Sequence, residues 1–198
     1  HCSYYDAVRK RYTIFGGFGN MYYSNKFYMF NAEEGRWNTL GSLSGDFLCP
    51  RYFSSAGYLD SNHSVYIFGG MGNESGDQVI GRCYFHDFYK VDLQEMRVQK
   101  LWDISEGQPN MVPAQDMVIL NDSCFYVLRY PESVSNSFLH LYRFSVEDGS
   151  CHILGDSIPI YSDKITTNAR LYYNERQSRL FVTVQETSDD VSSKFSSR

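Results

Sequence analysis

The sequence lacks several features that mark particular classes of protein. It has no uninterrupted apolar run near the roughly 18–20 residues that a membrane-spanning helix needs, so we expect no membrane insertion in this segment. Its 18 Lys and Arg residues are outnumbered by 23 Asp and Glu residues, which argues against a nucleic-acid partner. No segment shows a persuasive helical period. The glycine-rich stretches lack the lysine and the following helix of a phosphate-binding loop.

Cysteine is present, but not in a metal-binding or disulfide-framework pattern. The cysteines are widely spaced, their number is odd, and no CxxC pair occurs. This pattern argues against a zinc site and against a dense set of disulfides. We therefore predict mostly free, buried thiols that act as small hydrophobic side chains. These are Cys2, Cys49, Cys83, Cys124 and Cys151.

The chain is rich in aromatic residues and contains a repeated four-residue motif. Its 17 Tyr and 14 Phe residues favour strands, because aromatic side chains suit a pleated, half-buried surface. Ile14-Phe15-Gly16-Gly17 recurs as Ile67-Phe68-Gly69-Gly70, about 53 positions later. A strand followed by two glycines at such a period is typical of a β-propeller, in which each repeat forms one four-stranded blade. The sequence therefore predicts an all-β fold.

A second repeat has a fixed internal spacing. Phe30 is followed seven residues later by Trp37 and three residues after that by Leu40, and two later segments repeat the spacing. Repetition of the register predicts equivalent positions on the outer strands, with the three leucines buried. The corresponding triplets are Phe30, Trp37 and Leu40; Val91, Val98 and Leu101; and Phe144, Cys151 and Leu154.

The strand that ends at the diglycine also has later counterparts. Aligning the leading serines matches Ser64–Gly70 with Ser123–Arg129 and with Ser178–Val184. Turns rich in Asn and Asp come before these strands, as expected for hairpins. On this alignment Leu128 and Arg129 replace the two glycines in the third copy.

These repeats divide the chain into four blades of one propeller domain spanning residues 1–198. The predicted blades cover about 1–43, 51–101, 113–154 and 166–198. Both predicted ends cut through a blade, so we expect an incomplete ring whose remaining blades lie in the full-length chain. Because a propeller closes its ring to protect its edges, we expect the isolated segment to aggregate, dimerise or melt at low temperature.

The motif residues resemble the kelch repeat family. The first copy matches its pattern of a diglycine, then a Tyr, then a Trp in Phe15-Gly16-Gly17, Tyr28 and Trp37, whereas Val98 replaces the Trp in the second copy. The resemblance covers the whole chain in register, although the motifs weaken toward the C-terminus. It implies a kelch-type propeller of four-stranded antiparallel blades, with glycines at close backbone approaches and with the Tyr and Trp side chains packed between blades.

Four residues are candidates for a binding site at the mouth of a propeller channel. Arg51 follows a proline at the start of a predicted inner strand, where the kelch resemblance implies an arginine that can clamp an acidic ligand. Tyr52, Gln115 and Asn168 are expected near the same level. The alternative for Arg51 is a solvated strand cap. In that case recognition would move to two long polar loops, Gly72–Arg82 and Asp103–Met111.

These observations predict a non-catalytic recognition or scaffold module with no cofactor, no metal site and no catalytic residues. Its expected partner is a protein or peptide, with carbohydrate as a second possibility. One alternative is the ligand-sensing ectodomain of a bacterial signalling or carbohydrate-related protein. The other is a kelch-type oxidase or sugar-modifying enzyme, but His63, His86, His140 and His152 occupy dissimilar positions in the repeats. Ser145–Gly149 resembles a sialidase turn, with Glu147 in place of the aspartate, and is interpreted as a hairpin turn.

Overall fold

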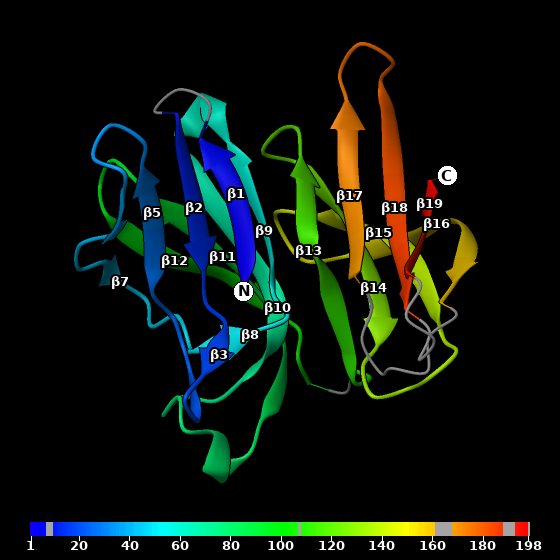
Figure 1. The fold of residues 1–198 in the computed structure, drawn as a ribbon, viewed down its shortest axis with the longest axis horizontal. Coiled ribbons are helices and arrows are strands. Elements are labelled where there is room, and N and C mark those ends of the chain that lie inside the picture. Colours follow the sequence, from blue (N-terminus) through cyan, green and yellow to red (C-terminus); the bar gives the residue numbers. More distant parts are fainter. Residues whose placement is uncertain (7–9, 107, 161–167, 188–192, 198) are drawn as a thin grey trace.

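The computed structural model describes residues 1–6, 10–106, 108–160, 168–187 and 193–197. It is all-β, as predicted, and consecutive strands form sheets that follow one another in chain order (Figure 1). The first sheet is antiparallel, in the order β1-β2-β5-β6. Its strands are β1 (Cys2–Asp6), β2 (Arg11–Phe15), β5 (Phe27–Asn31) and β6 (Arg36–Thr39).

The middle sheet contains two antiparallel groups of four strands, joined by a single parallel bridge between Asp116 of β13 and Ala56 of β9. The second group of the molecule consists of β9 (Ser55–Leu59), β10 (Ser64–Gly72), β11 (Cys83–Asp92) and β12 (Arg97–Asp103). The third group consists of β13 (Met111–Ile119), β14 (Cys124–Pro131), β15 (Phe138–Ser145) and β16 (Cys151–Pro159).

The remaining elements are a C-terminal sheet and several short pieces. The C-terminal sheet has the order β17-β18-β19, and the predicted start of its repeat near Thr166 lies outside the described residues. Its strands are β17 (Asn168–Asn174), β18 (Arg179–Thr187) and β19 (Ser193–Ser197). The short elements are β3 (Phe18–Gly19), β4 (Tyr22–Tyr23), β7 (Ser44–Gly45), β8 (Arg51–Tyr52) and two 3₁₀ turns, Asp60–Asn62 and Gln78–Ile80.

The two diglycines end their strands in the same backbone conformation. Gly16 and Gly17 have φ values of 68° and 104°, and Gly69 and Gly70 have 60° and 98°. These lie in the left-handed region, which glycine adopts without steric penalty. A Cβ atom at Gly70 would lie 2.6 Å from the carbonyl oxygen of Tyr52. The expected close approach of another backbone is confirmed.

The seven-residue spacing marks equivalent positions in successive hairpins, as predicted. Phe30 pairs with Trp37, Val91 with Val98, and Phe144 with Cys151, at the same position in three successive hairpins. The predicted burial of the leucines three residues later is wrong. Each of these leucines is only partly buried, and Leu40 lies just beyond the end of β6. They are Leu40, Leu101 and Leu154.

The alignment of the inner strands is off by one residue. Val91 and Phe144 are equivalent by their pairing, and their partners on the neighbouring strands are Val65 and Phe125. Ser64 therefore corresponds to Cys124, because Ser123 belongs to the preceding turn, where it donates to the side chain of Asn121. Arg129 and Tyr130, rather than Leu128 and Arg129, take the place of the diglycine in the third group.

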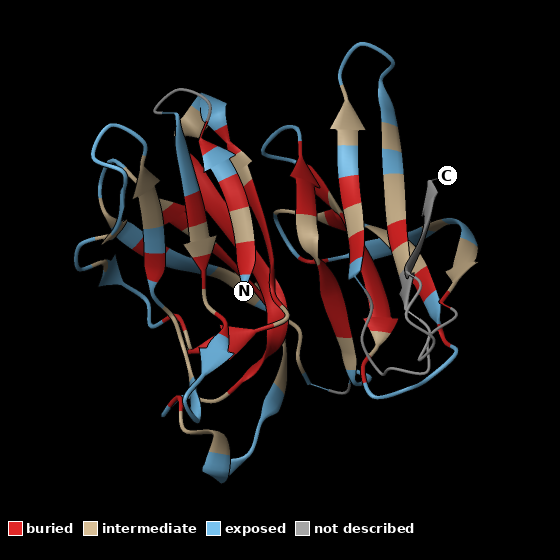
Figure 2. Cartoon of the chain, in the orientation of Figure 1, coloured by how far each residue is buried: buried red, intermediate tan, exposed pale blue. Residues whose placement is uncertain are grey.

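The core lies between successive groups, each packed face to face on the next. Figure 2 shows the buried residues concentrated on the strands, whereas the connecting loops are mostly exposed. The first and second groups share one cluster that includes Phe15, Phe27 and Val65. The second and third share a cluster around Phe68 and Phe125, and a further cluster joins the third group to the C-terminal sheet. Alternate side chains along a strand of the second group thus pack against the first group and against the third.

The predicted packing of the motif tryptophan and the cysteines is only partly correct. Trp37 was expected between blades, but 47% of it is exposed because no described sheet covers its side of the first sheet. Trp102 instead stacks on Phe88 in the core between the second and third groups, with ring centroids 5.0 Å apart. All five cysteines are free, as predicted, but only Cys2 and Cys124 are buried.

Candidate functional site

Arg51 is not placed as either sequence interpretation suggested. Its side chain is fully buried, so it is neither a ligand-facing clamp nor a solvated cap. Both terminal nitrogens of its guanidinium donate to Asp87, at 2.6 Å and 3.0 Å. Further hydrogen bonds go to the carbonyl oxygens of Gly69 and Cys49, and the guanidinium lies 4.4 Å from the ring centre of Phe85.

This arrangement satisfies the cation inside the protein. Burial alone lowers the pKa of Arg51, but the adjacent Asp87 carboxylate outweighs that effect and the net shift is upward. Bidentate pairs of this kind hold the guanidinium plane in one orientation. The pair therefore fixes the β8 segment against the diglycine of β10 and leaves no donor directed at solvent, so we do not propose Arg51 as a binding residue.

Tyr52, which follows Arg51 in β8, lies in a cluster of aromatic rings. It is buried and stacks on Tyr23, with ring centroids 5.2 Å apart, and it also contacts Phe18 at 5.0 Å. Arg82 donates to the Tyr52 hydroxyl at 3.0 Å and pairs with the buried carboxylate of Glu132. The cluster thus joins three separate loops through rings and one charged pair.

Two loops that contact Tyr52 are hydrogen-bonded to each other. The β3–β4 hairpin and the loop at 73–82 are linked by a backbone bond from Tyr23 to Gly76, at 2.6 Å, and another from Gln78 to Met21, at 3.0 Å. The hairpin turns at Asn20 and Met21, which both have positive φ, at 49° and 67°. Positive φ is uncommon for a residue such as methionine and is often associated with functional loops.

These joined loops carry several exposed apolar side chains, although loops are usually polar. We call it the loop platform and define it by its exposed hydrophobic side chains. Their exposed fractions range from 57% at Met21 to 76% at Val79. Exposed apolar side chains that gather in one region of a surface mark interaction sites more often than isolated ones do. The members are Phe18, Met21, Tyr22, Val79 and Ile80.

The other two predicted site residues come together elsewhere. Gln115 on β13 and Asn168 on β17 line one polar pocket of about 310 Å³. Beside it, Arg170 makes a bidentate ion pair with Asp116, at 2.6 Å and 2.9 Å, which ties the C-terminal sheet to the third group. The structure therefore separates the predicted set into a buried pair at β8 and this pocket.

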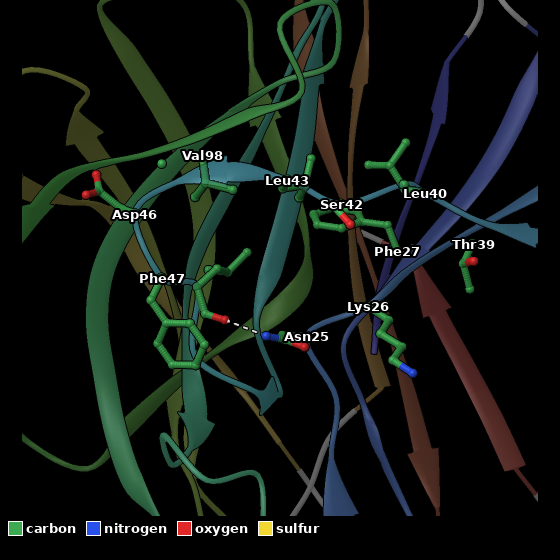
Figure 3. A pocket seen from close by; sticks show the side chains of 13 residues that line it. Asn25, Lys26, Phe27, Thr39, Leu40, Ser42, Leu43, Asp46, Phe47 and Val98 are labelled. Carbon is green, nitrogen blue, oxygen red and sulfur yellow. Dashed lines mark hydrogen bonds between the residues drawn. The ribbon is translucent and has the colours of Figure 1, made fainter.

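A larger pocket of about 440 Å³ lies between the first sheet and the segment that crosses to the second group (Figure 3). Its wall includes Phe27, Leu43 and Val98, and Asn25 donates to the carbonyl of Leu48 at 3.0 Å. The crossing segment is held by the carboxylate of Asp46, which accepts from the backbone of Lys100 at 2.7 Å. Because Asn25 and Asp46 hold the crossing segment through hydrogen bonds to backbone groups, we interpret this pocket as a seam between the first and second groups.

A buried cation–imidazole pair lies at the interface of the second and third groups. Arg129 is 97% buried, has no acidic partner among the described residues, and contacts His86 Nδ1 at 2.7 Å. His86 Nε2 is 3.1 Å from the carbonyl of Pro109, so the imidazole is neutral with its proton on Nε2. The guanidinium also lies within 5.0 Å of the Tyr142 ring centre. Burial and the nearby Arg129 lower the pKa of His86 to about 4.

This shift predicts a loss of stability in mild acid. The unfolded chain protonates His86 below pH 6.5, whereas the folded chain resists protonation down to about pH 4. The unfolded state thus binds more protons between these values, so stability falls as pH falls through this window, by about 1–3 kcal/mol. The measurement is urea unfolding from pH 7 to pH 4 of wild type and of His86→Gln. The difference in the free energy of unfolding between wild type and His86→Gln should change between pH 6.5 and pH 4. A difference that stays constant over this range would contradict the prediction.

Sequence reasoning missed the polar residues that organise this end of the molecule. Asp87 lies within the aromatic stretch Phe85–Tyr89 of β11. A carboxylate in such a stretch is unusual, because burying a charge without a partner is costly. An acidic residue in an apolar strand predicts a buried cationic partner, so Asp87 could have indicated this ion pair. Arg82 and Glu132 carry no such signal, because both are in polar stretches and meet only in the folded chain.

No protein-family model matches the sequence, and no curated protein is significantly similar to it. Among the residues that the structure describes, no helix has the length and apolar character needed to cross a membrane. Within the same residues, no three His, Cys, Asp or Glu side chains are grouped so that they could hold a metal ion.

Proposed function

We propose that this chain is part of a kelch-type β-propeller that acts as a non-catalytic recognition module, with the loop platform as its protein-binding surface. The observation that carries the proposal is the platform itself. It has five exposed apolar side chains on two loops that are bonded to each other. Protein interfaces concentrate their binding energy in a few such side chains, surrounded by polar ones.

The blade interpretation has support from the equal registers of three hairpins and from the matching diglycines. Each four-stranded group is an up-and-down antiparallel sheet that packs face to face on the next, as blades do. Loops that join rigid strands at one end are where proteins of this build place binding residues.

The base of the platform suits recognition without large rearrangement. Tyr23 stacks on the buried Tyr52, and Asn73 donates to two carbonyls of its own loop, at Asp77 and Gly81. A surface held in place before binding loses less conformational entropy when a partner docks. The partner we propose is a protein or peptide with apolar side chains. No observation favours the sensor or enzyme alternatives.

Site-specific photo-crosslinking tests the proposal. A photoreactive amino acid replaces Tyr22 in cells that make the protein, and in a matched control it replaces Leu120, which is 43% exposed outside the platform. We expect discrete protein crosslinks from position 22 only, and their loss when Ile80→Ser is added. Equal crosslinking from both positions, or none from position 22, would overturn the platform as the binding surface.

A further inference from the structure

The outer edge of the second group is covered by a segment from outside that group. The short strand β7 pairs with β12 in parallel, with Gly45 beside Val98. The backbone N–H of Asp46 donates to the carbonyl of Val98 at 2.9 Å, and the Asp46 carboxylate accepts from the backbone N–H of Lys100 at 2.7 Å. The crossing segment therefore binds backbone groups of β12 that would otherwise face solvent.

The sequence of the covering segment, Leu43-Ser44-Gly45-Asp46, suits this contact. Gly45 has a φ of 93°, and a Cβ atom there would collide with the carbonyl oxygen of Val98, so this position requires glycine. Leu43 packs against the apolar cluster that contains Val98, beside the pocket of Figure 3. Val98 is accordingly only 3% exposed. The chemistry that covers the edge is an apolar residue, a small residue, a glycine and an aspartate in succession.

The third group presents the same edge without a cover. Its outer strand β16 pairs with β15 in the register that β12 has with β11, so Cys151 and Ile153 correspond to Val98 and Lys100. β16 is the last strand of its sheet, and no strand of the described residues pairs with its outer side. Cys151 is exposed, and so is 54% of Ile153. An uncovered edge strand is a template for pairing with another chain.

The crossing segment that enters the third group binds elsewhere. Residues 104–110 connect β12 to β13, a shorter stretch than residues 40–50, which connect β6 to β8 and contain β7. The backbone N–H of Ile104 donates to the carbonyl of His86 at 3.1 Å, and the Ser105 hydroxyl accepts from the N–H of His86 at 2.8 Å. These bonds hold the crossing on β11 of the second group and leave the edge of β16 free of it.

We infer that the outer edge of β16 binds an extended segment of a partner protein whose sequence has the character of Leu43–Asp46. The partner's glycine pairs beside Cys151 in parallel, its aspartate accepts from the backbone N–H of Ile153, and its apolar side chain covers Cys151. Strand addition of this kind takes its affinity from main-chain hydrogen bonds and its specificity from the side chains. The inference uses neither the loop platform nor the kelch resemblance.

Cysteine alkylation tests the inference, because Cys151 lies at the proposed contact. The probe is a synthetic peptide with the sequence of residues 40–48, added to the full-length protein. Alkylation of Cys151 should slow by about tenfold when the peptide is at about ten times its dissociation constant, since only the unbound fraction reacts. Cys83, the other exposed cysteine of the described residues, should react at an unchanged rate. A control peptide with Gly45→Val should give no protection.

Two variants of the protein test where the peptide binds. Ile153→Pro removes the N–H that is proposed to bind the aspartate, and it should raise the dissociation constant of the peptide at least about tenfold. Ile153→Ala keeps this N–H and should leave the constant nearly unchanged. Proline is tolerated on an edge strand where its nitrogen faces outward, so both variants should fold. Circular dichroism checks that each keeps its strands.

Three results would overturn the inference. The first is unchanged alkylation of Cys151 with the wild-type peptide, or equal protection by the Gly45→Val peptide. The second is equal binding by Ile153→Pro and Ile153→Ala. The third is a Cys151 that is protected before any peptide is added, which would mean that a segment of its own chain fills the edge. The crosslinking experiment at Tyr22 is independent of all three, so failure at this edge and failure of the loop platform are distinguishable.

Discussion

Replacing Asp87 with alanine is expected to lower the free energy of unfolding by about 3–5 kcal/mol, because it leaves the Arg51 guanidinium buried without its counter-ion. The pair is the most enclosed of the described ion pairs, with side chains 0% and 2% exposed. Removing one partner of a buried pair sacrifices their attraction but keeps the desolvation of the other. Urea unfolding at neutral pH, monitored by fluorescence, measures the change.

Two further variants make this prediction specific. Glu34→Ala breaks an exposed ion pair, in which the Arg36 side chain is 68% exposed and the Glu34 side chain 47%. This variant should change the free energy of unfolding by at most about 1 kcal/mol. The double variant Arg51→Met with Asp87→Leu removes both charges, so it should lose less stability than Asp87→Ala alone. If Asp87→Ala were no more harmful than Glu34→Ala, Arg51 would not depend on its buried partner.

Replacing Phe68 with alanine is expected to destabilise the protein by about 3–5 kcal/mol. Phe68 is 1% exposed and packs between the second and third groups, with ring centroids 4.8 Å from Phe144 and 5.4 Å from Phe125. Truncation would open a cavity among rigid rings that relax poorly. It would also remove one ring beside the guanidinium of Arg129. Denaturant unfolding of Phe68→Ala and Phe68→Leu should show a much smaller loss for leucine.

Trp37→Ala is the matched control for this core prediction. The sequence pattern alone favours a similar loss, of about 3–5 kcal/mol, for a tryptophan packed between blades. Because 47% of Trp37 is exposed, we expect a loss of about 1–2 kcal/mol for Trp37→Ala. Equal losses at Trp37 and Phe68 would contradict the burial difference between the two faces.

The strands and their pairing within each group could be read from the sequence because they depend on local features. Glycine adopts positive φ without steric penalty, and Gly16 and Gly69 adopt it alike. The seven-residue spacing fixes a hairpin, so Phe30 and Trp37 face each other whatever the surroundings. The alignment errors arose where Ser123 and Ser178, which lie in turns, were aligned with Ser64, which lies in a strand.

The site could not be read in the same way, because it depends on residues far apart in the sequence. Arg51 is predicted from the sequence to lie at the surface, because its partner Asp87 is 36 positions away along the chain. Only the folded chain brings the two side chains together. The loop platform exists because two loops about 55 positions apart share backbone hydrogen bonds. Neither loop shows this by its composition.

The sequence by itself determined where strands begin, where they turn and which residues pair across each hairpin, since these follow from short-range sterics and side-chain alternation. Only the tertiary structure decided which face of each sheet is covered. Trp37 and Val98 hold the same hairpin position, yet one is 47% exposed and the other 3%. Burial is a property of what packs against a residue, and only the arrangement of the sheets specifies that.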